Sequence, residues 1–259
     1  MPQNRQPEPT LLVRSLALGL PPGFEITAHD HGWPQLVFAS GGALVVETDR
    51  HAWIAPSQRA VWVPAGVPHR LRAIGATSMR TVYLSPRSDR AHGDGDETRV
   101  LQVSPLLREL VLHTVERGVL PESDDGARNL ARVLIDQIAS APRLPFDVPL
   151  PTDPRARRIA DLVRAHPAEP APLAELAAGS GASPRTVERI FRRETGLTFG
   201  QWRRQLRLLH GTCRLAAGDT VTAAALAAGY DSTSAFIAVF RDAVGETPGR
   251  FFRAPGDTA

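Results

Sequence analysis

Two histidines and a glutamine near the start of the chain are the residue types best placed to do chemistry. The segment HDHGWPQ places His29 and His31 two positions apart, and Gln35 follows four positions after the second histidine. Because side chains on a strand alternate between its two faces, both imidazoles would point the same way in an extended segment. Imidazole pairs arranged in this way hold metal ions, and they also line polar pockets. This segment alone leaves both interpretations open.

The composition is that of a globular protein of two modest domains. Of the 259 residues 42% are hydrophobic, and no apolar run reaches the roughly 18 residues that a membrane helix needs. The first residues, MPQNRQPEPT, lack the basic-then-apolar order of a signal peptide. The one cysteine, Cys213, cannot form an internal disulfide and is expected to be a small buried side chain. We therefore expect a cytoplasmic protein.

Arginine supplies all of the basic residues, and its distribution along the chain is uneven. The sequence contains 30 Lys and Arg together, and every one is arginine. Residues 1–153 carry a net charge of −2, whereas residues 154–259 carry +5. We therefore expect a polyanion to bind the C-terminal part.

The N-terminal part predicts an all-β domain over residues 1–100. Between about Phe24 and Leu84, short runs rich in β-branched and aromatic residues alternate with turn residues, as in FEITAH, QLVFAS, ALVVET and RTVYLS. This pattern is typical of a β-sandwich or barrel. The polar, glycine-rich stretch Ser85–Thr98 predicts an exposed loop.

Two helices and a proline-rich hinge are expected over residues 101–153. Ser104 followed by Pro105 is a good N-cap and first-turn pair, and apolar residues then recur at helical spacing. A second helix is predicted over residues 126–139. The apolar face that these helices share could form a dimer contact or pack against the β domain. Five prolines from Pro142 to Pro154 then predict a semi-rigid linker and a domain boundary.

An internal repeat divides residues 154–259 into two helical units. FRRETGLTFGQW, which starts at Phe191, aligns without gaps on FRDAVGETPGRF, which starts at Phe240, at an offset of 49 residues. Upstream of each copy an alanine is followed four positions later by a glycine, at Ala177–Gly181 and Ala225–Gly229. A small alanine lets two helices approach closely, and glycine permits a left-handed turn. Each unit therefore has the pattern of a helix-turn-helix.

The first unit presents arginine on the face opposite its expected core. Ser183 is the predicted N-cap and Pro184 the first helical residue. The outward positions are Arg185, Thr186, Glu188, Arg189, Arg192 and Arg193. Guanidinium groups match guanine edges and phosphates, although a solvated face on an ordinary helical bundle has the same pattern. Residues 199–217 predict one connecting helix of roughly 28 Å, close to the ~34 Å between successive major grooves, which favours DNA.

The region from Arg155 to Arg253 resembles the AraC/XylS family of bacterial transcriptional regulators, with GLTFGQW and GETPGRFF following the two recognition helices. The resemblance implies an α+β protein with a cupin-like, effector-sensing β-barrel, a helical linker, and an all-α domain with two helix-turn-helix units. It implies base reading by Arg185, Thr186, Glu188 and Arg189, with Arg192 and Arg193 near phosphates. In the second unit Ala238 stands where many members carry Arg. That unit is therefore expected to hold the DNA backbone through Thr233, Ser234 and Arg241.

The same resemblance gives HDHGWPQ a partner segment. A β domain ahead of an AraC-like domain is usually a cupin-type barrel, and PAGVPH, residues 64–69, supplies His69. His29, His31 and His69 fit the three-histidine part of the cupin metal pattern. Gln35 stands near the position of the usual Glu and is a poorer ligand for most divalent ions. The histidines could therefore form an effector pocket with or without a divalent metal, a structural hydrogen-bonded group, or a catalytic metal site.

These observations together predict a sequence-specific transcriptional regulator and not an enzyme. Its expected partners are promoter DNA, a small-molecule effector, RNA polymerase and a second copy of the chain, with no membrane. The competing prediction is a metal-dependent cupin enzyme whose helical region serves assembly.

Overall fold

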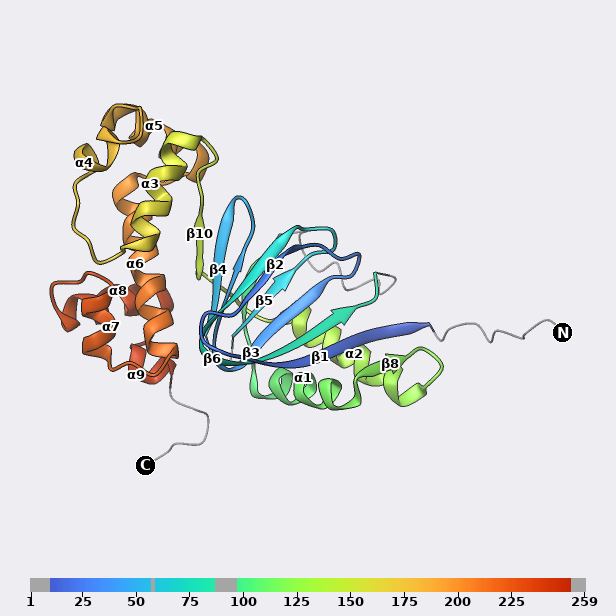
Figure 1. The fold of residues 1–259 in the computed structure, drawn as a ribbon. Helices are drawn as coiled ribbons and strands as arrows, with labels where there is room; N and C mark the ends of the chain where they lie inside the picture. Colours follow the sequence, from blue (N-terminus) through green and yellow to red (C-terminus); the bar gives the residue numbers. More distant parts are fainter. Residues whose placement is uncertain (1–9, 57–58, 87–96, 253–259) are drawn as a thin grey trace.

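The computed structural model describes residues 10–56, 59–86 and 97–252, and it has a β-barrel domain with a helical domain against it (Figure 1). This is the α+β arrangement that the sequence predicts. Residues 87–96 of the predicted exposed loop lie outside the described residues. In the part of the chain that is described, no helix is long and apolar enough to cross a membrane.

Two long strands, β3 and β6, organise the barrel. The strands up to the first helix are β1 (Leu11–Leu20), β2 (Glu25–His29), β3 (Gln35–Glu47), β4 (His51–Pro56), β5 (Arg59–Val63), β6 (His69–Leu84) and β7 (Arg99–Gln102). Strand β6 pairs antiparallel with β1, β2 and β3, and β3 also pairs with β4 and β5. The segments QLVFAS and ALVVET are therefore one strand, not two. Its register shifts near Gly41 and Gly42, where a Cβ on Gly42 would lie 2.5 Å from the Ala76 carbonyl oxygen.

Three short strands extend the sheet beyond the segments that the sequence predicts as strands. They are β8 (Val119–Pro121) on β1, β9 (Arg143–Leu144) on β7, and β10 (Asp147–Pro149) on β4. The last two belong to the segment that the prolines mark as a linker. Proline is tolerated there because these strands lie at the edges of the sheet. At such an edge, the missing backbone N–H of proline interrupts no hydrogen bond between strands. The linker thus runs along the barrel rather than away from it.

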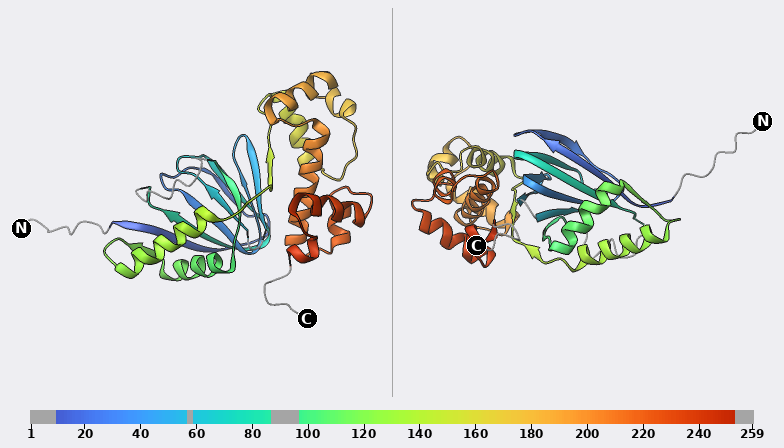
Figure 2. Two further views of the ribbon diagram at one scale, coloured as in Figure 1. Left: turned by 180° about the vertical axis from the view of Figure 1, so that it is seen from behind. Right: turned by 90° about the horizontal axis from the view of Figure 1, so that it is seen from below.

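Helices α1 (Pro105–Arg117) and α2 (Asp125–Ser140) cover one outer face of the sheet (Figure 2). Ser104 caps α1, as predicted, by accepting a hydrogen bond from the Leu107 amide at 3.1 Å. Their buried residues form one cluster with Leu36 and Phe38 of β3 and with buried residues of β5 and β6. The apolar face that the two helices share therefore packs on the β domain, while Leu106 and Val133 stay exposed.

The helical domain contains two helix-turn-helix units joined by one helix. Its elements are α3 (Pro154–Ala165), α4 (Leu173–Ala178), α5 (Pro184–Thr195), α6 (Phe199–Ala216), α7 (Val221–Ala227), α8 (Thr233–Val244) and α9 (Pro248–Phe251). The turns contain Gly181 and Gly229, both with positive φ, as the repeat predicts. Helix α6 is continuous over 18 residues and begins with a capping box formed by Thr198 and Gln201.

The two units pack on different parts of the barrel. The core of the first unit, including Phe191 and Trp202, is continuous with the outer face of β4 at Ala52 and Ile54. The core of the second unit, including Phe236, Phe240 and Phe251, is continuous with the inner face of the barrel. Hydrogen bonds fix the first contact: Trp202 Nε1 donates to the Pro149 carbonyl oxygen at 2.7 Å, and Gln205 Nε2 donates to that of Asp147 at 2.6 Å.

Candidate functional site

The barrel brings His29, His31, Gln35 and His69 together; we call this group the histidine cluster. His29 ends β2, Gln35 begins β3 and His69 begins β6, so three strand ends meet here. The ring centroids of His29 and His69 lie 4.5 Å apart, those of His31 and His69 5.1 Å, and those of His29 and His31 5.9 Å. One ring nitrogen of each histidine lies within 4.8 Å of the other two. His69 is buried, whereas His29 and His31 are half-buried.

Backbone carbonyl groups fix the tautomer of all three imidazoles. The acceptors are the carbonyl oxygens of Thr27 for His29 (2.8 Å), Trp33 for His31 (2.6 Å) and Val67 for His69 (2.8 Å), each on Nδ1. A carbonyl oxygen can only accept, so each Nδ1 carries the proton. In the neutral ring the other nitrogen, Nε2, then has a free lone pair.

Gln35 is oriented by hydroxyl groups that the sequence analysis did not single out. Its amide Nε2 donates to Thr81 Oγ1 at 2.8 Å and to the Tyr83 hydroxyl at 2.9 Å. Thr81 in turn donates to the Leu36 carbonyl oxygen at 3.2 Å, which leaves its lone pair to accept from Gln35. The sequence feature that could have revealed these two hydroxyl groups is the alternation in RTVYLS, which places Thr81 and Tyr83 on the same face of a strand.

Acceptor atoms therefore converge at the centre of the histidine cluster. Gln35 Oε1 lies 2.9 Å from His31 Nε2 and 3.1 Å from His69 Nε2. Burial lowers the pKa of His69 to about 4, with smaller contributions from His29 and His31, against the opposing effect of the Val67 carbonyl. The His69 ring is therefore neutral at neutral pH. Three lone-pair nitrogens and one amide oxygen form a donor set that suits a borderline divalent cation.

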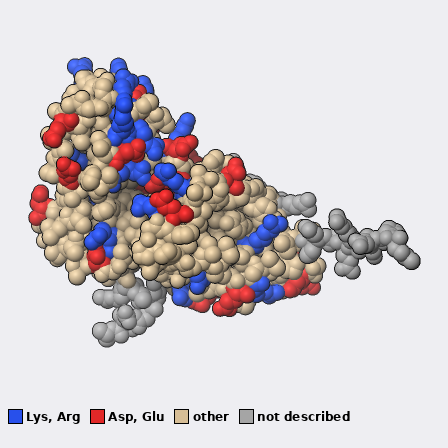
Figure 3. Space-filling model, in the orientation of Figure 1, with Lys and Arg blue, Asp and Glu red and all other residues tan. Residues whose placement is uncertain are grey.

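Helix α5 presents its arginines to solvent as the sequence predicts. Ser183 caps the helix by accepting from the Thr186 amide at 3.2 Å, and Val187, Ile190 and Phe191 are buried. The exposed residues of this face are Arg185, Arg189, Arg192 and Arg193. Figure 3 shows arginine side chains gathered over the first unit and along its border with the barrel. The face of α5 that carries these four arginines is the candidate DNA-binding face.

Two of the predicted base-reading residues also make contacts within the domain. Thr186 Oγ1 lies 2.9 Å from the capping Ser183 hydroxyl. Glu188 accepts a hydrogen bond from the Phe199 amide at 3.3 Å and lies 3.7 Å from Arg192 Nε. In the free protein these side chains are therefore held by their neighbours. Among the exposed arginines, Arg192 pairs with Glu188 and Arg193 with Glu194, whereas Arg185 and Arg189 form no ion pair or hydrogen bond with the described residues.

The second unit offers fewer charged groups on its recognition helix. Phe236 and Phe240 of α8 are buried, while Ser234, Ala238 and Arg241 are exposed. The Thr233 hydroxyl donates to that of Thr222 on α7 at 3.3 Å. Arg241 is thus the one arginine that α8 carries, in its last turn.

The fold and the two sites define the class of protein, and comparisons with known families agree. Residues 20–144 match the family model of the AraC-like ligand binding domain, and residues 176–254 match that of a helix-turn-helix domain. The chain belongs to the AraC family of transcriptional regulators, with an N-terminal ligand-binding domain and a C-terminal DNA-binding domain.

Two regulators and one solved structure are similar to all or part of this chain. The chain is 34% identical over 223 residues to the HTH-type transcriptional regulator NimR of Escherichia coli K12, covering 86% of this chain and 81% of NimR. It is 30% identical to the regulator RipA of Corynebacterium diphtheriae, over 61% of this chain and 44% of RipA. Among solved structures, the DNA-binding domain of AdpA in complex with a target DNA is 30% identical, with a TM-score of 0.35, over 38% of this chain and 89% of that one.

Proposed function

We propose that this regulator senses a small-molecule effector at the histidine cluster, with a divalent metal ion as part of the site. The observation that carries the proposal is the convergence of acceptors. With neutral rings, the contacts of Gln35 Oε1 with His31 Nε2 and His69 Nε2 bring lone pairs together at 2.9 Å and 3.1 Å. A cation among these atoms would replace that repulsion with attraction.

The surroundings of the cluster support the same proposal. Metal-bound histidines usually donate their other ring nitrogen to a carbonyl or carboxylate, which fixes the tautomer and the ring direction. Here each Nδ1 already has a carbonyl acceptor. His29, His31 and His69 would supply nitrogen ligands, and Gln35 an oxygen ligand. The half-buried side of the site would admit an effector.

A purely structural alternative needs the opposite orientation of the Gln35 amide. Its NH2 group would then donate to His31 and His69, and its oxygen would accept from Thr81 and Tyr83. The polar atoms of Gln35, His31 and His69 would then all find partners without an ion, but His29 Nε2 would not, and the hydrogen bond from Thr81 to the Leu36 carbonyl would be lost. The two arrangements differ in metal content, which is measurable.

The experiment is metal analysis of the purified full chain after exposure to Zn²⁺ and removal of free ion. We expect about one ion per chain in the wild type, in line with the single set of four donor atoms, and loss of that ion in His31→Ala. His113→Ala changes an exposed histidine of α1 and should leave the stoichiometry unchanged. A wild type that retains no more metal than His31→Ala would overturn the metal site.

Effector sensing is tested by the response of DNA binding. His69→Ala should abolish the change in operator affinity that the effector causes, while basal operator affinity stays close to that of the wild type. If His69→Ala and His31→Ala respond to effector like the wild type, the cluster is structural.

For DNA, we propose that α5 reads bases through Arg185, Glu188 and Arg189, with Thr186 beside them, and that Arg192, Arg193 and Arg241 contact phosphates. Thr233 and Ser234 would add hydroxyl contacts to the backbone. The regulator would act in the cytoplasm on promoter DNA, with RNA polymerase and a second copy of the chain as further partners. The exposed arginines of α5 support this assignment.

A second candidate function follows from the same donor set. Three histidine nitrogens and one oxygen around a redox-active metal could support turnover of a small molecule, as in a cupin enzyme. Conversion of a bound compound by the iron-loaded protein, together with no salt-sensitive DNA binding, would favour this function over regulation.

A further inference from the structure

A cavity of the barrel domain lies next to the histidine cluster in sequence but contains none of its four residues. It has a volume of about 470 Å³ and is lined by Trp53, Val67, Pro68, Asp147 and residues 48–51 and 97–98. No residue of the helical domain belongs to this lining. A cavity of this size is within the range that small-molecule sites occupy.

Two stacked rings form a flat wall of the cavity. His51 and Trp53 are alternate residues of β4 and therefore share one face of the strand. Their ring centroids lie 5.2 Å apart, with 23° between the ring planes. Burial lowers the pKa of His51, against the opposing effects of Asp147 and Glu97, so its ring is neutral at neutral pH. Aromatic faces of this kind attract cations that lie over them.

The carboxylate of Asp147 lies beside this wall. Asp147 of β10 is the register partner of Trp53, so both side chains lie on the same face of the sheet, whereas Val148 packs on the helical domain. Asp147 is half-buried, and its carboxylate forms no ion pair or hydrogen bond with another residue in the part of the chain that the structure describes. Burial raises the pKa of Asp147, and His51 opposes this effect. A cation in the cavity would provide the partner that a buried charge requires.

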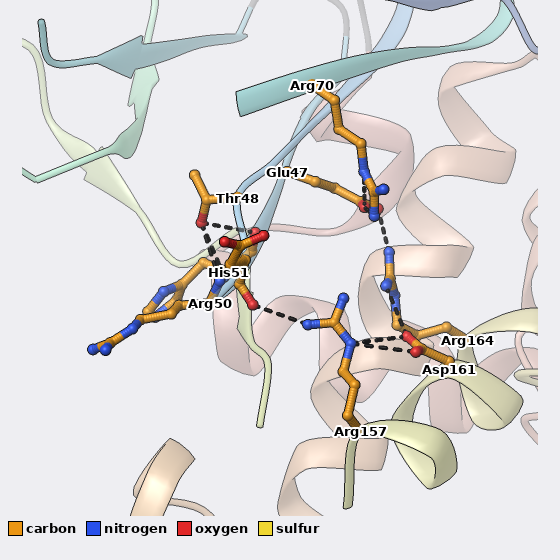
Figure 4. Close-up of polar contacts among 9 residues, drawn as sticks. Glu47, Thr48, Arg50, His51, Arg70, Arg157, Asp161 and Arg164 are labelled. Carbon is orange, nitrogen blue, oxygen red and sulfur yellow. Dashed lines mark hydrogen bonds and ion pairs between the residues drawn. The ribbon is translucent and has the colours of Figure 1, made fainter. Parts of the chain in front are cut away.

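The arginines nearest to the turn between β3 and β4 are engaged on its other side (Figure 4). Arg157 of α3 donates to the Asp49 carbonyl oxygen at 2.9 Å. Glu47 pairs with Arg70 of β6 at 2.6 Å and also with Arg164 of α3. None of these three arginines lines the cavity, so they do not neutralise its carboxylates.

The charges in the lining itself favour a cation. Three lining residues, Asp49, Glu97 and Asp147, are acidic, and Arg50 is basic. Asp49, Arg50 and Glu97 are exposed, so water and salt screen their charges. Asp147 is thus the acidic group of the cavity that water reaches least.

We propose that this cavity binds an organic cation, an amine with a flat apolar body, as a further ligand of the regulator. The ammonium group would donate hydrogen bonds to Asp147, and the flat body would lie along His51 and Trp53. Val67 connects the cavity to the histidine cluster, because its carbonyl oxygen accepts a hydrogen bond from His69. The two sites share no ligand atom, so the amine needs no metal ion in order to bind.

The experiment is calorimetric titration of the full chain with three compounds that share an indole ring: tryptamine, a cation; tryptophol, which is neutral; and indole-3-acetate, an anion. We expect the wild type to bind tryptamine roughly tenfold more tightly than tryptophol, and indole-3-acetate most weakly. Asp147→Asn should remove the preference for tryptamine. Asp242→Asn, at an exposed carboxylate of α8 outside the cavity, should preserve it.

Two further variants make the test independent of any loss of folding in Asp147→Asn. His51→Arg keeps Asp147 but places a guanidinium beside it, and should also abolish the preference for tryptamine. His31→Ala, which alters the histidine cluster, should bind tryptamine like the wild type. The melting temperature of each variant shows whether it is folded.

Three results would overturn the proposal. The first is equal affinity of the wild type for tryptamine and tryptophol, or no heat of binding for tryptamine at millimolar concentration. The second is a preference for tryptamine that persists in folded Asp147→Asn or His51→Arg. The third is loss of tryptamine binding in folded His31→Ala, which would place the amine at the histidine cluster instead.

Discussion

The guanidinium carbon of Arg59, on strand β5, lies 4.1 Å from the centroid of the Phe251 ring in helix α9. Phe251 also meets Phe146, beside β10, with ring centroids 5.6 Å apart, and Phe240 of α8 at 5.3 Å. Through these ring contacts, the second helix-turn-helix unit packs on the inner core of the barrel. A change of packing inside the barrel has a direct route to α8 through these rings.

Phe251→Ala should remove this connection. Loss of a buried aromatic ring leaves a cavity, and we expect the free energy of unfolding to fall by roughly 3–5 kcal/mol. The response of DNA binding to effector should fall further than basal DNA binding does. Urea denaturation and operator titration check the two effects. Phe252→Ala, at a half-buried ring that does not lie under Arg59, is the control; equal losses in both variants would argue against a specific connection.

Arg189→Ala should change sequence preference, whereas Arg192→Ala should not. A bidentate contact of Arg189 with a base edge contributes about 1–3 kcal/mol, so its loss should relax selection at one base pair. Loss of a phosphate contact at Arg192 should weaken binding to all sequences alike. Affinity measured across a library of operator variants checks this. A preference governed mainly by Ser234 and Thr233 would contradict the order of importance of the two units.

DNA affinity should depend steeply on salt. If arginines neutralise phosphates, the logarithm of the binding constant falls linearly with the logarithm of salt concentration, with a slope of about −0.9 per phosphate. Arg193→Ala should reduce the magnitude of that slope by about 0.9. Fluorescence anisotropy at several salt concentrations measures both slopes. Affinity that does not change with salt would exclude arginine–phosphate contacts as its source.

Glu47→Gln should weaken the docking of the domains in a pH-dependent way. Burial alone would raise the pKa of Glu47, but Arg164 and Arg70 outweigh it and hold the pKa below its usual range. The carboxylate therefore stabilises the fold above the unfolded-state pKa of about 4, and this contribution is lost as pH falls through the lower folded-state pKa. At pH 7 we expect a loss of about 1–3 kcal/mol.

Chemical denaturation of wild type and Glu47→Gln at a series of pH values tests this expectation. The difference between the two proteins should shrink as the pH is lowered below 4. Glu109→Gln alters an exposed ion pair with Arg108 and should cost at most about 1 kcal/mol at pH 7. A difference for Glu47→Gln that is constant over the pH series would mean that its charge does not matter.

Short sequence patterns correctly predicted those structural elements that depend mainly on neighbouring residues, such as helix caps and turns. Ser104 and Ser183 cap the helices that they were expected to cap, and the repeat located both helix-turn-helix units. The meeting of His29, His31 and His69 was also predicted, through the cupin resemblance of PAGVPH. The strand alternation expected for His29 and His31 was wrong, because β2 ends at His29 and His31 lies in the segment that follows it. Strand β1 was missed because LLVRSLALGL does not alternate cleanly between apolar and polar residues.

Contacts between distant segments had no comparable signal. Glu47 and Arg164 are 117 positions apart, and nothing in either neighbourhood indicates that one carboxylate serves two arginines. The orientation of Gln35 by Tyr83 spans 48 positions. Such pairs form only when helices and strands pack against each other. The hydrophobic pattern of an element indicates which of its faces is buried, but not which other element covers that face.

The contacts of strand β10 determine where the chain can be cut into separate barrel and helical fragments. A fragment that begins at Pro154, where the sequence suggests a boundary, would leave the indole N–H of Trp202 and the amide of Gln205 without their acceptors at Pro149 and Asp147. A barrel fragment that ends before Arg143 would expose the edges of β4 and β7, which invites pairing with other chains. A helical domain isolated for crystallisation with DNA should therefore carry residues 145–153 with it.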